Sequence, residues 1–336
     1  MSSVLVTGGS GFIAGHVILA LLDAGHTVRT TVRSLAREDA VRATLTAAGM
    51  TRGDALSFVA ADLLSDEGWA AAVSGVEYVQ HVASPVMPGH VEDSDSVIVP
   101  AREGTLRVLR AASAAGVRRV VLTSAFHAVS WGHPHDGHVF TEEDWTVLDG
   151  PGVDAYGRAK TLAERDAWEF AASSGIELTT LLPVAVMGPI MGGEVTGSNH
   201  IVQRMLAGAM PGFPDISIPV VDVRDVATAH VLAMTSADAG GERFLLSNGE
   251  VLSLAEIGSI LREALGAGAE RVPTRRIPSL VVRVAALVRP EFRATVPDLG
   301  YRKKTSNAKA RRVLGWEPRP AAEAIVAAGR SMTAAG

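Results

Sequence analysis

The chain has 336 residues and a mass of 35.0 kDa, enough for two domains or one large α/β unit at roughly 150 residues per domain. Its 47% hydrophobic and 20% charged residues are ordinary globular proportions, which exclude a disordered, collagenous or coiled-coil protein. A formal net charge of -5 disfavours nucleic acid as the main partner, and the absence of cysteine excludes disulfides, thiolate metal sites and a cysteine nucleophile.

Neither a membrane span nor a signal peptide is expected. The longest uncharged apolar stretch, from Leu178 to Gly193, is interrupted by Pro183 and Pro189 and is too short to cross a bilayer. Only three residues precede the first β-branched run, which leaves no room for a basic region followed by an apolar one. We therefore expect a cytoplasmic protein without a membrane partner.

Short runs rich in Val, Ile and Leu alternate with longer segments of helical periodicity through the first half of the chain. The predicted strands span residues 3–7, 27–32, 56–61, 76–82, 119–123 and 177–182. Near-continuous apolar strands joined by helical crossovers predict a mostly parallel sheet covered on both faces, the Rossmann-type doubly wound fold. Ligands of such folds bind at the carboxyl ends of the strands.

A glycine-rich turn follows the first predicted strand and precedes an apolar-periodic helix. Gly8 permits a tight turn, Gly11 lets the backbone approach a pyrophosphate, and the helix start offers free N–H groups to an anion. Ala14 replaces the third glycine of the fingerprint, and its methyl group is tolerable there. The pattern predicts a dinucleotide site rather than an ordinary βα turn.

The end of the second strand indicates which dinucleotide binds. An NAD enzyme usually carries Asp or Glu there for the ribose hydroxyls, whereas this chain has Arg33, with Arg37 beyond it. A guanidinium suits a 2′-phosphate and gains little from a free diol, so we expect NADP(H). The alternative is that Arg33 is a solvated cation at a strand end.

A helix predicted to begin at Asp154 places Tyr156 and Lys160 four residues apart on one face. A phenol is a poor acid at neutral pH, and a neighbouring cation is expected to lower its pKa by favouring the phenolate. The pair follows the dinucleotide turn and the fifth strand, which makes it a candidate proton-transfer site.

Spacing becomes less regular after Pro183, and we expect a smaller substrate lobe there. Strands are predicted at 216–221 and 242–247, and Ser253 with Glu256 forms a capping box for a helix ending at Leu265. A closing helix is predicted over 321–332, and the apolar segment 277–288 is either a buried helix or a flexible cover. The predicted cofactor domain is 1–183 with part of 215–250, and the lobe is 184–214 with 251–336.

The chain resembles the extended short-chain dehydrogenase/reductases, more closely the dihydroflavonol 4-reductase-like carbonyl reductases. The resemblance covers nearly the whole chain. Its motifs are Thr7-Gly8-Gly9-Ser10-Gly11-Phe12-Ile13, Val28 to Arg33, Asp62-Leu63, His81 to Pro85, the Tyr156/Lys160 pair, Val220 to Ala227 and Leu314-Gly315-Trp316.

The resemblance implies roles for individual residues. Tyr156 is expected to protonate the carbonyl oxygen while hydride arrives from the nicotinamide, and Lys160 to bind the nicotinamide ribose and tune Tyr156. The other implied cofactor contacts are Thr7, Gly8, Gly11, Phe12 and Ile13 in the turn, Arg33 at the ribose, Asp62 and Leu63 at the adenine, Ala83 and Ser84 in the cleft, and Pro183 and Val186 at the nicotinamide end.

One position departs from that family. The fifth strand usually ends in Thr-Ser-Ser, and the second Ser hydrogen-bonds the substrate carbonyl, but this chain has Ala125 after Thr123 and Ser124. Successive residues of a strand face opposite sides of the sheet. Ser124 can therefore donate the substrate hydrogen bond in place of residue 125 only if the strand twists or bulges there. Ser124 or His127 could supply the bond, directly or through water, or catalysis proceeds more slowly without it.

The loop after the fifth strand holds His133, His135 and His138 close to Asp136. Histidines on a Pro/Gly loop have no regular ligand geometry, so we expect a solvated loop and no metal. Phe126, His127 and Trp131 are predicted to line the substrate pocket, with core packing as the alternative for Phe126 and Trp131. The charge runs 142–144 and 302–304 are predicted to be solvated surface.

The sequence therefore predicts NADPH-dependent, reversible reduction of an aldehyde or ketone, with a small-molecule substrate and a monomer or homodimer as the active form. Two alternatives stay open. One is a nucleotide-sugar epimerase or dehydratase that holds NAD tightly, and the other is a non-catalytic NADP(H)-sensing protein, which the alanine at position 125 would suit.

Overall fold

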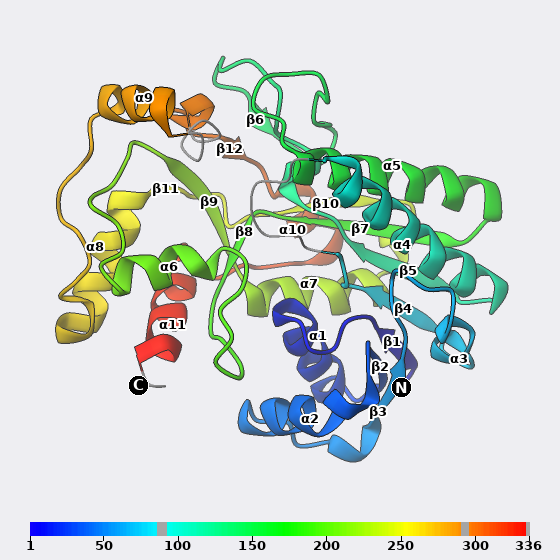
Figure 1. Ribbon diagram of the computed structural model, residues 1–336. Helices are drawn as coiled ribbons and strands as arrows, with labels where there is room; N and C mark the ends of the chain where they lie inside the picture. The colour runs from blue at the N-terminus through cyan, green and yellow to red at the C-terminus, as the bar shows by residue number, and fades with distance from the viewer. Residues whose placement is uncertain (86–92, 290–295, 334–336) are drawn as a thin grey trace.

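The main sheet is parallel throughout and sets the architecture of the molecule (Figure 1). The computed structural model describes residues 1–85, 93–289 and 296–333. Within these ranges seven strands pair in the order β10-β7-β5-β4-β1-β2-β3. Their bounds are β1 Ser3–Val6, β2 Thr27–Val32, β3 Leu56–Ala60, β4 Tyr78–His81, β5 Arg119–Thr123, β7 Glu177–Pro183 and β10 Arg243–Leu246. The order reverses direction between β1 and β4, where doubly wound folds bind ligands.

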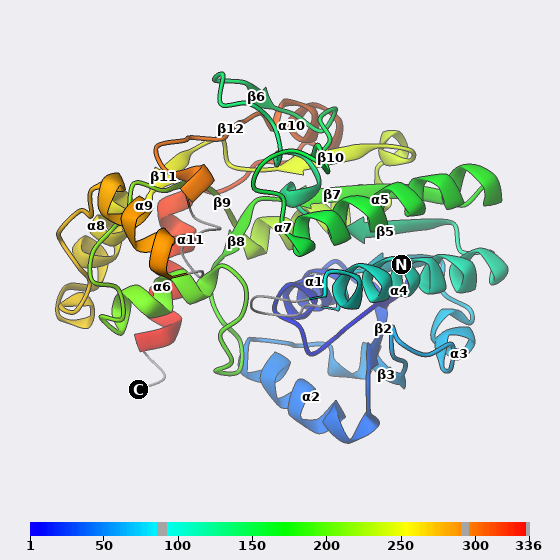
Figure 2. The ribbon, with the colours of Figure 1, turned by 45° about the horizontal axis from the view of Figure 1, so that its top comes forward.

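Helices cover both faces of this sheet (Figures 1 and 2). α1 (Phe12–Asp23) and α7 (Val223–Thr235) pack against each other and share one apolar cluster with the sheet, whereas α3 (Trp69–Val73), α4 (Asp95–Ala114) and α5 (Ala155–Ser174) contribute to a second cluster. Strand residues alternate between the clusters, since Val4 and Val6 lie in the first and Leu5 in the second. α2 (Glu38–Ala47) lies beside the β2–β3 edge.

A smaller unit is built around a three-stranded sheet in the order β11-β9-β8. Its strands are β8 Ala185–Met187, β9 Ser217–Asp222 and β11 Val251–Ser253, and its helices are α6 Asn199–Leu206, α8 Leu254–Leu265 and α11 Ala321–Thr333. A separate cluster of buried side chains, including Phe213, Ile257 and Ile325, forms its core. α9 (Ser279–Val288) lies on the outside of this unit (Figure 2).

The Rossmann-type prediction is confirmed, and the predicted strands and helices match the observed ones closely. Ser253 and Glu256 form the expected capping box at the start of α8. Of the two alternatives for the segment 277–288, the buried helix is wrong, because α9 is a helix whose Leu280 and Leu287 are 71% and 76% exposed. The flexible cover stays a prediction. β8 and β11 are too short, at three residues each, for an apolar run to have predicted them.

The division into a cofactor domain and a substrate lobe remains a proposal, with one change from the predicted bounds. β12 (Lys304–Thr305) pairs with β6 (Val139–Phe140), and α10 (Ala308–Leu314) packs on β10. Trp316 is fully buried and donates its Nε1–H to the Asp225 carbonyl oxygen at 2.8 Å. We therefore propose that residues 304–316 belong to the large unit, and the other described residues between 251 and 333 to the lobe.

Both charge runs were predicted to be solvated, and both predictions are wrong in part. Along β12 and the residues before it, Tyr301, Lys303 and Thr305 are buried while Arg302 and Lys304 are exposed, the alternation of a strand with one covered face. Glu142 is 8% exposed. Among the helices in the described part of the chain, none combines the length and hydropathy needed to cross a membrane.

Candidate functional site

The glycine-rich turn links β1 to the start of α1 at the switch point of the sheet. Gly8 has a φ of +75°, and a Cβ there would lie 2.9 Å from the Cβ of Ala83. Such a φ is open to glycine at little cost. The Gly8 N–H donates to Thr31 Oγ1 at 2.9 Å, which fixes the turn to β2. Gly11 is the N-cap residue of α1 and has no side chain to cap it, so N–H groups of the first turn remain available to an anion.

Thr7 ties the turn to the end of β4. Its Oγ1 accepts the N–H groups of Val82 and Ala83 at 3.0 and 2.9 Å, which occupies both lone pairs. Its proton therefore points to His81 Nδ1, 2.9 Å away, and His81 carries its own proton on Nε2. That Nε2 is buried without a hydrogen-bond partner among the described residues, and burial together with Lys160 lowers the pKa of His81 to about 3.

The other predicted cofactor residues gather along the same edge of the sheet. Arg33 follows β2, is exposed, and makes no hydrogen bond or ion pair with the described residues, so its guanidinium is available. Asp62 and Leu63 follow β3, and Ala83 and Ser84 follow β4. Pro183 ends β7 and Val186 lies in β8. Phe12 and Ile13 begin α1. The sheet thus brings these residues together, while their cofactor contacts remain predictions.

Tyr156 and Lys160 project from the first turns of α5, where Asp154 caps the helix by accepting the Gly157 N–H at 2.7 Å. The Tyr156 hydroxyl has no hydrogen-bond partner among the described residues, and Lys160 Nζ donates to the Thr123 carbonyl oxygen at 3.4 Å. The expected lowering of the Tyr156 pKa is wrong for this structure, because burial and the Asp154 carboxylate raise it to about 12. Burial lowers the pKa of Lys160 to about 8.

Ser124 does not face the site as a free donor. Its hydroxyl donates to Glu164 Oε2 at 2.6 Å, and Glu164 also accepts from Thr180 Oγ1 and Arg243 Nε, each at 2.8 Å. Ser124 and Glu164 are 4% and 1% exposed, so this is a buried network that joins α5 to β7 and β10. A hydroxyl has one proton, and that of Ser124 is already engaged in the hydrogen bond to the Glu164 carboxylate. Its predicted role toward the substrate is not supported by this arrangement.

An aromatic group stands beside Tyr156 instead. The His127 ring stacks on Trp131, with centroids 3.8 Å apart and planes at 14°, and meets the Tyr156 ring edge to face at 4.9 Å and 78°. Phe126 lies behind them, 4% exposed and packed on Phe140. His127 and Trp131 are the partly buried members of this group, so they are the ones with surface left for a substrate.

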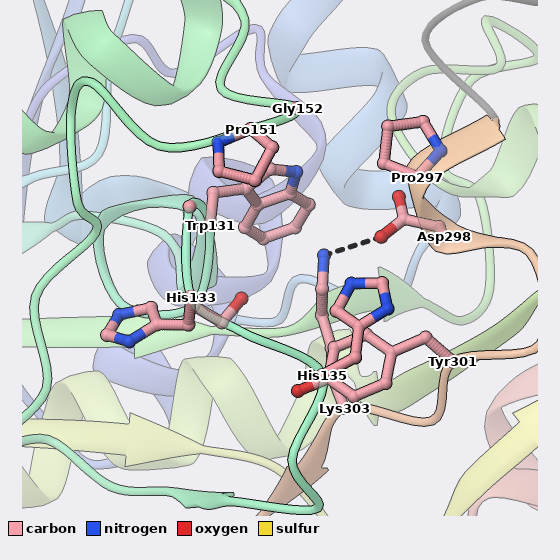
Figure 3. A pocket seen from close by; sticks show the side chains of 11 residues that line it. Trp131, His133, His135, Pro151, Gly152, Pro297, Asp298, Tyr301 and Lys303 are labelled. Atoms are coloured by element: carbon pink, nitrogen blue, oxygen red, sulfur yellow. Dashed lines mark ion pairs between the residues drawn. The ribbon is translucent and has the colours of Figure 1, made fainter.

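A small pocket opens on the far side of Trp131 (Figure 3). Lys303 Nζ lies 3.6 Å from the Trp131 ring centroid and 2.9 Å from Asp298 Oδ1, and His135 stacks on Tyr301 at 3.7 Å. The sequence pattern does not single out Lys303, because it lies in a run of three basic residues. The period-2 alternation of buried and exposed residues from Tyr301 to Thr305 is the signal that could have identified it.

The loop histidines each have a different surrounding. His133 Nε2 lies 3.0 Å from the Trp145 carbonyl oxygen, His138 pairs with Asp144 at 3.0 Å, and His135 belongs to the pocket just described. The described residues contain no cluster of three His, Cys, Asp or Glu side chains suited to a metal ion. The expectation of a metal-free loop stays a prediction.

Residues 4–247 match the profile of the NAD dependent epimerase/dehydratase family. The match spans more than half of the chain, so the protein belongs to this family, whose extended short-chain dehydrogenase/reductase motifs it carries. Several of its sequence relatives are named as reductases. Tetraketide alpha-pyrone reductase 2 of Arabidopsis thaliana is 34% identical over 268 residues, which cover 78% of this chain and 82% of that one.

Two further relatives extend this pattern. Cinnamoyl-CoA reductase 1 of Oryza sativa subsp. japonica is 38% identical, covering 77% of this chain and 75% of its own. Dihydroflavonol 4-reductase of Zea mays is 31% identical, covering 78% and 74% respectively. The resemblance to dihydroflavonol 4-reductase-like proteins is therefore confirmed.

Solved structures show the same architecture over the whole chain. The yeast methylglyoxal/isovaleraldehyde reductase Gre2, complexed with NADPH, superposes with a TM-score of 0.79 at 26% identity and 98% coverage of both chains. Gre2 from Candida albicans, also in complex with NADPH, gives a TM-score of 0.81 at 25% identity, covering 100% of this chain and 99% of that one.

Proposed function

We propose that the protein is an NADPH-dependent reductase of aldehydes or ketones that also runs in reverse toward alcohol oxidation. The observation that carries the proposal is the Tyr156 hydroxyl, which has no partner in the described protein and lies one helical turn from Lys160 at the carboxyl edge of the sheet. The reductase names of the relatives and the NADPH-bound structural neighbours support it.

The residues present fit a dinucleotide phosphate. The glycine turn packs so closely on Ala83 that only glycine fits at position 8, and the α1 N-terminus, which offers N–H groups to an anion, has no acidic residue in its first turn. Arg33 is a cation without a partner among the described residues and so is available to a 2′-phosphate, and no acid stands at the end of β2 to hold an unphosphorylated ribose. When bound, NADPH supplies the hydride.

Tyr156 supplies the proton in this proposal. A phenol with a pKa of about 12 stays protonated at neutral pH, and an alkoxide forming on the substrate is far more basic than a phenolate, so transfer to the substrate oxygen is downhill. Lys160 provides positive charge near the resulting phenolate. Its ammonium is held over the sheet edge by the Thr123 carbonyl oxygen, which leaves two of its three protons for a ribose hydroxyl or water.

The proposal is tested with a panel of aldehydes, ketones and 2-oxo esters, assayed with NADPH and NADH side by side. We expect NADPH oxidation with at least one panel member, and the Tyr156→Phe variant to lower kcat by at least about 10²-fold while NADPH still binds. Phe keeps the ring that packs on His127, so the variant removes only the hydroxyl.

Other outcomes would favour the alternatives. Protein that purifies with NAD bound and converts a UDP- or dTDP-sugar would be an epimerase or dehydratase, which the family name includes. Tight NADPH binding without turnover of any panel member would favour the sensing role. A cytoplasmic location and a monomeric or homodimeric state remain predictions from the sequence.

A further inference from the structure

In the described part of the chain, the fifth strand ends without a free side-chain hydrogen-bond donor for a substrate carbonyl. Ala125 offers only a methyl group, and the one proton of Ser124 is donated to Glu164. Glu164 accepts from Ser124, Thr180 and Arg243 together, which is the environment of an ionised carboxylate, so the Ser124 proton is firmly held. Proton transfer from Tyr156 alone would leave the developing charge on the substrate oxygen with a single partner.

His127 has the placement of a substitute donor. It lies in the short turn η3 (Phe126–Ala128) directly after the strand end, and its carbonyl oxygen accepts the Thr146 hydroxyl at 2.7 Å, which fixes the backbone. Its ring is held between Trp131 and Tyr156 by aromatic contacts alone. Neither ring nitrogen hydrogen-bonds to a described residue, although the ring touches the ring that carries the proposed proton.

The charge state of His127 also suits a donor. Burial, with Lys303 and Lys160 as the cations that act on it, lowers the pKa of its imidazole to about 3. The ring is therefore neutral at physiological pH, with one N–H and one lone pair. A neutral imidazole polarises a carbonyl while Tyr156 remains the acid, because its N–H is a weaker acid than the phenol.

We propose that His127 is a catalytic residue whose ring N–H donates a hydrogen bond to the substrate carbonyl oxygen, in place of the hydroxyl missing at position 125. The inference rests on the carbonyl reductase function proposed above. The imidazole keeps its proton and exchanges no electrons. The carbonyl carbon gains the hydride, the oxygen gains the proton of Tyr156, and the His127 N–H stabilises the charge on that oxygen between these events.

The test compares four proteins on the carbonyl compound that the wild type reduces fastest. His127→Phe keeps the stacking on Trp131 but removes the N–H, and we expect kcat to fall by about 10²-fold, the usual effect of losing one such donor. The double variant with Ala125→Ser should have a kcat at least about tenfold higher than His127→Phe alone, since it returns a hydroxyl to the strand end. His138→Phe, a loop histidine paired with Asp144, is the matched control and should keep the wild-type kcat.

Binding and folding are measured beside the rates. NADPH affinity by fluorescence titration and the Tm should be the same in His127→Phe as in the wild type, within about threefold and a few degrees. A His127→Phe variant with wild-type kcat overturns the inference and leaves the reductase function standing, as does a loss of kcat that Ala125→Ser does not restore.

A second pair of variants applies if His127→Phe fails to fold. His127→Asn keeps an N–H donor and should retain a higher kcat than His127→Ala, and equal kcat values in the two overturn the inference. A wild type that reduces no carbonyl compound overturns both proposals.

Discussion

Lys160 is the residue whose charge most directly limits the proposed reaction. It is nearly enclosed by the sheet edge and α5, and burial opposes its positive charge more than Glu164 favours it. The result is an ammonium that loses its proton close to physiological pH, whereas the Tyr156 hydroxyl keeps its proton far above it. The two members of the pair therefore titrate in separate ranges.

This separation predicts the pH profile of the reductase reaction. A lysine is charged below its pKa, so the active form is present below about pH 8 and is lost as the pH rises through that value. We expect kcat/KM to fall above about pH 8, approaching tenfold per pH unit. Lys160→Arg keeps its charge throughout this range, so its profile should stay level, at a lower overall rate. A wild-type profile that stays level to pH 10 would contradict the prediction.

The Glu164 network shows what Ser124 does at the scale of elements. α5 carries the candidate catalytic pair, and Glu164 on the same helix accepts hydrogen bonds from side chains of three strand segments: Ser124 just after β5, Thr180 within β7 and Arg243 at the start of β10. Arg243 also lies over the Trp145 ring, 3.6 Å from its centroid, and donates to the Glu142 carbonyl oxygen. The network thus sets the position of α5 against the sheet.

Removing one partner from this network should cost more than removing a surface ion pair. Glu164→Gln leaves the Arg243 guanidinium, 11% exposed, without its counter-charge, and we expect the free energy of unfolding to drop by about 3 kcal/mol or more. Ser124→Ala removes a single hydrogen bond and should cost about 1 to 3 kcal/mol. Urea unfolding measures both. A Ser124→Ala variant that loses activity but no stability would restore the catalytic role predicted for this residue from the sequence.

At the scale of the whole molecule, Trp316 joins distant parts of the chain. Its indole is fully buried in the main core, its N–H binds the Asp225 carbonyl oxygen on α7, and Arg319 next to it pairs with the Asp225 carboxylate. We expect Trp316→Ala to lower the free energy of unfolding by about 3 to 5 kcal/mol. Leu287→Ala, at a side chain that is 76% exposed, is the control and should change it by less than about 0.5 kcal/mol. Equal losses of unfolding free energy in the two variants would contradict the role of Trp316 in joining distant parts of the chain.

The sequence predicted the fold well because its evidence is local. Apolar runs, the glycine turn and the Ser253 capping box each act within a few residues, and the sheet order follows from βαβ connections. The site was predicted less completely, since Lys303 reaches Trp131 only through the pairing of β12 with β6, and Ser124 turns to Glu164 forty positions away. Burial also reversed the expected effect on the Tyr156 pKa, and burial is a property of the assembled fold.

The pairing of β6 with β12 has a consequence for the order in which the protein is made. The cofactor turn, the candidate proton donor and His127 are all synthesised in the first half of the chain, but the strand that brings Lys303 to Trp131 follows only near the end. A nascent chain halted before residue 301 would carry the whole glycine turn and the Tyr156/Lys160 pair, yet lack Tyr301 and Lys303, which line one side of the pocket beside Trp131. That pocket is thus completed last, once translation is almost finished.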